Sequence, residues 1–176
     1  MGLLPKDRSP ETAAEKALLK MSWEGEYLGV GLFQELLKKY PQYTDELQAG
    51  ASMEWFNIGY CKRIAHELDV HMTLDEAQKM QQEGWEYVRK NATFEDVAKA
   101  VIAETPNTVK MYTKMAKEAH SAQLRALGTD FGEHEQALSD WCQSVLNGKS
   151  DGGEKIFAYL ERHGVTREAA LAPLEV

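Results

Sequence analysis

Four ionisable side chains stand at helical positions that the surrounding pattern gives to apolar residues: Glu26, Glu54, Glu104 and His134. Around each of them, apolar residues recur at steps of three and four, the spacing of one face of a helix. Carboxylate and imidazole groups are ligands for iron, manganese and similar ions. Acids that converge in a core also repel each other, which raises their pKa values or requires a cation. Metal binding is therefore the first chemistry that these residues indicate.

Glu26 belongs to the first predicted helix. Ser9 and Pro10 are typical of a helix start, with Ser as the cap and Pro at the first helical position. The apolar pattern then continues to about Tyr40, and Glu26 is the single carboxylate in the middle of this stripe. We expect Glu26 to occupy a core position.

Thr44 caps the second predicted helix, which runs to about Leu68 and has Glu54 and Asn57 on its apolar face. A short turn joins this helix to the first one, so the two should be antiparallel neighbours. Glu26 then lies opposite residues near position 56. We expect Glu26 to meet Glu54 and Asn57.

Three further helices are predicted, a shorter one from Thr73 to about position 90 and two longer ones that start at Thr93 and Ser121 and end near positions 119 and 146. The first of them opens with a capping box and is interpreted as a connector. Glu104 lies on the apolar stripe of the second, and His134 lies on that of the third. These two helices form a second hairpin, which places one acid and one imidazole in the core.

The chain is predicted to be a single helical domain over residues 1–176, with a bundle at about 10–147. A Gly-rich loop follows the bundle, and a C-terminal helical extension covers about 151–176. Its helix spans 154–162, with Gly164 as the C-cap and a tail after it that ends in Pro173.

The two hairpins are related by an internal repeat. A shift of 77 positions lays Thr44 on Ser121, cap on cap, and lays Asn57 on His134. In the preceding helices, a shift of 78 lays Glu26 on Glu104. Each hairpin thus supplies one mid-helix Glu, followed about thirty residues later by an inward i, i+3 pair.

This arrangement resembles the ferritin-like, rubrerythrin-related superfamily, in which two Glu and two Glu-x-x-His pairs project into a helical bundle. The resemblance covers residues 12–147. It implies an antiparallel four-helix bundle of two hairpins that binds iron or manganese and acts as an oxidoreductase with dioxygen or peroxide. It also implies Glu26, Glu54, Glu104 and His134 as metal ligands, with Asn57 as a weak amide ligand.

The two pairs differ from the family pattern at one position each. Asn57 stands where the first pair would have His, and Phe131 stands where the second would have Glu. A dinuclear centre needs bridging and terminal carboxylates and an imidazole for each metal. A single metal held by His134 and carboxylates is therefore the alternative to a pair of metals.

A metal-free interpretation is also open. Buried carboxylates can be satisfied by Asn57, by tyrosine hydroxyls or by a lysine, and the bundle would then be a non-catalytic binding or assembly module. The remaining histidines have no metal-ligand spacing and are expected at surfaces or helix ends. Copies of the chain could associate through exposed helix faces.

Composition excludes several classes of protein. The 176 residues include 28 acidic and 20 basic side chains, for a net charge of -8, which repels nucleic acids and anionic membranes. No signal sequence and no apolar run long enough to cross a bilayer is expected. The two cysteines, Cys61 and Cys142, suggest no disulfide framework and fit a cytoplasmic protein.

Overall fold

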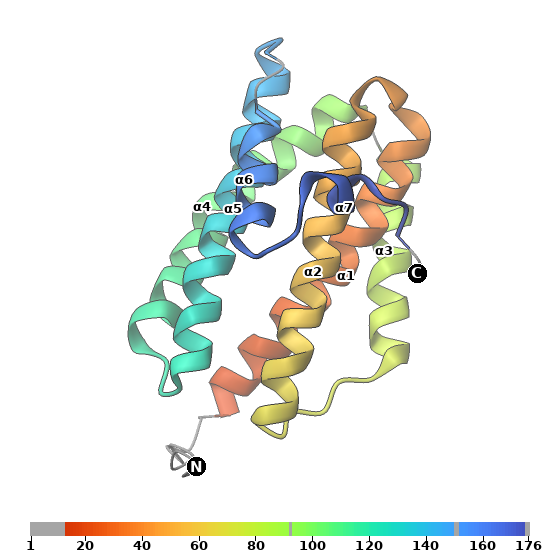
Figure 1. Ribbon diagram of the computed structural model, residues 1–176. Coiled ribbons are helices and arrows are strands. Elements are labelled where there is room, and N and C mark those ends of the chain that lie inside the picture. The colour runs from red at the N-terminus through yellow and green to blue at the C-terminus, as the bar shows by residue number, and fades with distance from the viewer. Residues whose placement is uncertain (1–12, 92, 150–151, 175–176) are drawn as a thin grey trace.

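The computed structural model describes residues 13–91, 93–149 and 152–174, and every regular element within these ranges is a helix (Figure 1). The predicted all-α class is confirmed. The helix start expected at Ser9 and Pro10 lies outside the described residues. In chain order the elements are α1 (Ala13–Lys39), a 3-10 turn η1 (Pro41–Tyr43), α2 (Thr44–Glu67), α3 (Leu74–Asn91), α4 (Phe94–Glu118), α5 (Ala122–Leu146), α6 (Glu154–Arg162) and α7 (Arg167–Leu171).

Three predicted helix starts are confirmed by their caps. The hydroxyl of Thr73 accepts from the backbone N–H of Glu76, and the Glu76 carboxylate accepts from the N–H of Thr73, which completes a capping box. Thr93 and Ser121 accept in the same way from the N–H groups three residues later, at 3.2 and 3.1 Å. These side chains fix where α3, α4 and α5 begin.

The start of α2 differs from the prediction. Thr44 is the first helical residue rather than the cap, and its hydroxyl donates to the Pro41 carbonyl at 2.6 Å. The η1 turn continues directly into α2, so the chain reverses through a 3-10 turn. The two helices still pack as neighbours, as the sequence indicated.

The predicted connector, α3, is packed along α1 through two glycines. A Cβ at Gly31 would lie 2.1 Å from the Gln81 carbonyl oxygen, and one at Gly84 would lie 2.2 Å from that of Leu28. Any side chain at either position would force the helices apart. The backbones of α1 and α3 therefore approach more closely than other residues would allow.

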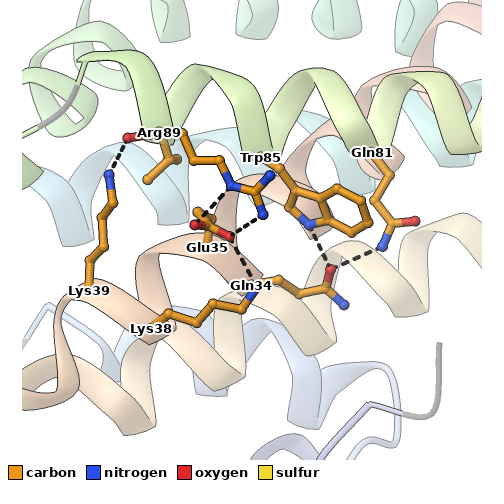
Figure 2. A network of polar contacts seen from close by, with 8 residues as sticks. Gln34, Glu35, Lys38, Lys39, Gln81, Trp85 and Arg89 are labelled. Atoms are coloured by element: carbon orange, nitrogen blue, oxygen red, sulfur yellow. Dashed lines mark hydrogen bonds and ion pairs between the residues drawn. The ribbon is translucent and has the colours of Figure 1, made fainter.

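Polar side chains hold the ends of α1 and α3 together (Figure 2). The guanidinium of Arg89 donates to both carboxylate oxygens of Glu35, at 3.1 and 3.2 Å. Gln81 and Trp85 both donate to the side-chain oxygen of Gln34. Hydrogen bonding to Arg89 lowers the pKa of Glu35. The connector is thus an integral layer of the fold.

The second hairpin packs α4 against α5, with Gly128 at the contact, where a Cβ would lie 2.5 Å from the Ala116 nitrogen. Helix α6 packs on α5 and α2 and buries Ile156 and Leu160 completely. Helix α7 lies against α2, where Ser52 donates to the Ala170 carbonyl at 2.7 Å. Helix α7 was not predicted from the sequence.

The apolar interior consists of two clusters. One contains Phe33, Leu47 and Trp141, and the other contains Trp23, Ile64 and Leu124. On α2, Met53 belongs to the first cluster and Ile58 to the second. On α5, Leu138 belongs to the first cluster and Phe131 to the second. The polar residues predicted from the sequence interrupt the apolar packing at this level.

None of the helices described for residues 13–174 combines the length and the apolar character needed to cross a membrane.

Candidate metal centre

Glu26 on α1, Glu54 on α2 and His134 on α5 converge where the two apolar clusters meet. Each offers one ligand atom, and these three atoms all lie within 4.8 Å of one another. The exposed fractions are 2% for Glu26, 4% for Glu54 and 2% for His134, so all three are buried. We call these residues the Glu-Glu-His cluster. The structure thus brings together three of the residues that the sequence analysis selected.

The imidazole of His134 lies between the two carboxylates. Its Nε2 is 3.2 Å from Oε1 of Glu54, whereas its Nδ1 is 3.8 Å from Oε1 of Glu26. Nδ1 has no hydrogen-bond partner among the described residues, although it is buried. A buried nitrogen without a partner is uncommon in native proteins and calls for a cation, a proton or another ligand.

A glycine makes room for the Glu54 carboxylate. A Cβ at Gly29 on α1 would lie 2.5 Å from the carboxyl carbon of Glu54. Any larger residue at position 29 would therefore push this carboxylate out of its place. The absence of a side chain at Gly29 is a local requirement of the cluster.

Asn57 orients Glu26. Its Nδ2 donates to Oε2 of Glu26 at 3.1 Å, and its Oδ1 accepts from the hydroxyl of Tyr159 at 2.9 Å. The contact between Glu26 and Asn57 was predicted, and it is confirmed. The oxygen with which Asn57 would bind a metal is hydrogen-bonded to Tyr159, so the amide acts on Glu26 in this structure. Tyr159, on α6, was not predicted.

Burial dominates the electrostatics of the cluster. Desolvation raises the pKa of Glu26 well above its ordinary value, and the Coulombic effect of His134 opposes this shift. Burial also raises the pKa of Glu54 to about 8, against a hydrogen bond from Glu26 that lowers it. Without a bound cation the carboxyl group of Glu54 therefore retains a proton at neutral pH, and burial favours the protonated form of Glu26 as well.

Glu104 does not lie in the cluster. The sequence analysis placed it on the buried stripe of α4, but the structure places it at an exposed position. The neighbouring Thr105 is buried instead, and its hydroxyl donates to the Val101 carbonyl at 2.7 Å. The prediction that Glu104 faces the core is therefore wrong.

Glu135 is an acid that the sequence analysis missed. It is half-buried next to the cluster, and its pKa is raised mainly by burial. Its charge in turn contributes to the raised pKa values of Glu26 and Glu54. The residue lies one position off the stripe that contains His134, so helical periodicity gave no signal for it.

The second hairpin, α4 and α5, contributes only the imidazole of His134 to the Glu-Glu-His cluster. Phe131, at the position that matches Glu54, packs its ring 5.9 Å from that of His134 and 5.4 Å from that of Tyr112. Glu133 is exposed and forms an ion pair with Arg162 at 2.6 Å. Two carboxylates and one imidazole match the donor set of a single ion, but they do not match that of a dinuclear centre.

The remaining candidates lie elsewhere. His120 pairs with Glu15 at 3.1 Å, and His163 lies 3.9 Å from Asp130. Cys61 and Cys142 are both free and buried, and burial raises the pKa of each thiol.

Searches with this chain against protein-family models, curated proteins and solved structures give no match.

Proposed function

We propose that this protein is a ferritin-like metalloprotein in which α1, α2, α4 and α5 form the four-helix bundle. Glu26, Glu54 and His134 would hold one iron or manganese ion inside it. The observation that carries this proposal is the convergence of three buried donor groups, from three different helices, within 4.8 Å. Exposed acidic side chains often cluster without binding an ion, whereas these three groups are buried.

The donor set supports iron or manganese. Carboxylate and imidazole ligands suit these ions, whereas soft thiolate ligands would favour copper(I) or zinc. A divalent cation would also neutralise the buried carboxylates and release the protons that they hold in its absence. Asn57 and Tyr159 would keep Glu26 in position, as outer partners do at metal sites.

Three protein ligands leave coordination positions on the ion for water or a small molecule. Bound iron or manganese would supply redox chemistry with dioxygen or peroxide. The chain's own contribution is to bury the site, to orient Glu26 through Asn57 and to hold Glu54 against Gly29. Such a site would suit an oxidoreductase.

The alternative is a metal-free bundle that acts as a binding or assembly module. It is supported by the hydrogen bonds that Glu26 and Glu54 already make to Asn57 and His134. Protons would then compensate the buried carboxylates permanently, and the cluster would be a relic with a structural role.

Thermal unfolding in the presence of iron(II) or manganese(II) separates the two. A ligand that binds only the folded state stabilises it by about 2.7 kcal/mol at one hundred times its dissociation constant. We expect either ion to raise the unfolding temperature of the wild type and to leave that of His134→Ala unchanged. An equal response of the two proteins to the ions would support the metal-free module instead.

A further inference from the structure

A large cleft opens beside the Glu-Glu-His cluster, between α1 and α3 on one side and α4 and α5 on the other. Its volume is about 850 Å³, within the range of small-molecule sites. Apolar side chains form most of its wall, among them Leu28, Leu32, Val97, Val101, Met111 and Leu138. Glu26, Glu54, His134 and Glu135 lie along one part of the same wall.

The cleft carries exposed apolar surface at its border. Only three large apolar side chains are exposed among the described residues, and two of them, Met21 and Tyr87, line this cleft. They are 46% and 38% exposed. Apolar surface that gathers at an opening beside convergent polar groups is typical of a ligand site.

The charged side chains that line the cleft are acidic. The described residues of its wall include five carboxyl groups and no lysine or arginine; Glu83 and Glu104 are exposed carboxylates, and Glu26, Glu54 and Glu135 are buried or half-buried. A carboxylate or phosphate ligand would add to this negative charge. An organic cation would instead be attracted to it, and the aromatic faces of Phe33, Phe94 and Trp141 would attract it further.

A second observation concerns the imidazole. Nδ1 of His134 is buried among the residues that line the cleft, 3.8 Å from Oε1 of Glu26, and it has no hydrogen-bond partner in the described part of the chain. An amine brings N–H donors and a lone pair or a charge to this place, whereas a pure hydrocarbon would leave the polar wall unpaired.

We infer that the cleft binds an organic amine with an elongated apolar body, whose amino end lies against Glu135, beside the Glu-Glu-His cluster. The apolar body lies between α1 and α4, along Leu28, Leu32 and Val101. This inference goes beyond metal binding, since the cleft and its charges are present in the chain without an ion. If the metal proposal also holds, such an amine is the substrate class of that site.

Gly25 gives a way to close the cleft. This residue lines the cleft on α1, and a Cβ there would meet nothing within 4 Å. Gly25→Trp should therefore fill the cleft without a clash in the core. Gly59 on α2 is the matched control, because a Cβ there also meets nothing and the residue does not line the cleft.

The test is calorimetric titration of the protein, as purified and after chelation, with decylamine, decanoate and decanol below their aggregation limits. We expect decylamine to bind at least about tenfold more tightly than the other two, the size of one charge-assisted contact. Gly25→Trp and Glu135→Gln should each weaken decylamine binding by about tenfold or more, whereas Gly59→Trp should leave it unchanged.

Three results would overturn the inference: decanoate or decanol binding as tightly as decylamine, no effect of Gly25→Trp, or no binding of decylamine at all. A dimer detected by sedimentation that Gly25→Trp dissociates would also overturn it, because a second copy of the chain would then occupy the cleft. Metal content is measured separately from these titrations. Failure of the amine inference is therefore distinguishable from failure of the metal proposal.

Discussion

Nε2 of His134 lies 3.2 Å from Oε1 of Glu54, and this contact joins α5 to α2 across 80 residues of sequence. Another buried polar contact between the two hairpins is the hydrogen bond that the Tyr112 hydroxyl donates to Ser22 at 3.2 Å. Together with Glu26, His134 and Glu54 make a buried group with two acids and one base.

The first prediction concerns pH. Burial raises the pKa of Glu54 from 4.5 to about 8, so the folded metal-free protein keeps a proton that the unfolded chain has released. Stability from this group is therefore fully present below pH 4.5 and is lost as the pH rises toward about 8. Urea midpoints measured with a chelator should fall across this window, and they should fall less steeply for Glu54→Gln. Equal slopes for the two proteins would contradict the assignment.

Metal binding should depend on pH in the opposite sense. Because the ion must displace the protons held by the carboxyl groups, the affinity for iron or manganese should increase across the same pH window.

The second prediction concerns Tyr159, whose hydroxyl donates to Oδ1 of Asn57 in the core. Tyr159→Phe leaves that oxygen buried without its partner, which costs about 1–3 kcal/mol. The free energy of unfolding in urea measures this loss. Tyr27→Phe is the matched control, since Tyr27 is also buried and its hydroxyl makes no hydrogen bond to another described residue. An equal loss in both variants would show that Tyr159 acts only through packing.

The third prediction compares two glycines of α1. A Cβ at Gly29 would lie 2.5 Å from the Glu54 carboxyl group, whereas one at Gly25 meets nothing within 4 Å. Gly25→Ala should stabilise the protein by about 0.5–1 kcal/mol, because alanine is the better helix former. Gly29→Ala should displace Glu54 and weaken metal binding. Thermal unfolding and metal titration of both variants check this, and retention of full metal affinity in Gly29→Ala would contradict the role given to Gly29.

Much of this group could be predicted because it depends on local periodicity. Glu26, Glu54 and His134 interrupt apolar stripes at helical spacing, and a short turn between α1 and α2 is enough to place Glu26 beside Asn57. The caps of α3, α4 and α5 are likewise local signals.

The stripe on α4 was misleading for a physical reason. Val101, Thr108 and Met111 on that stripe are only partly buried and line the cleft, as Glu104 does. An apolar residue on a cleft wall has the same sequence pattern as one in a closed core. The pattern therefore predicted that Glu104 is buried, although α4 stands away from α1 there.

Other features depend on contacts that no local pattern contains. Tyr159 reaches Asn57 from 102 positions away, on a helix that follows a loop. The close packing of α3 on α1 depends on Gly31 and Gly84 facing backbone of the other helix. Helix α7 has five residues, which is too few for an apolar stripe to be recognised.

The central claim is that Glu26, Glu54 and His134 hold one ion. Its most direct measurement is the metal content of the protein after loading with iron(II) or manganese(II) and removal of unbound metal. The wild type and Glu104→Gln should retain about one ion per chain, because Glu104 is exposed and outside the cluster, whereas Glu54→Gln and His134→Ala should retain far less. A wild type that retains well below one ion per chain, or a Glu104→Gln variant that loses metal as completely as Glu54→Gln, would contradict it.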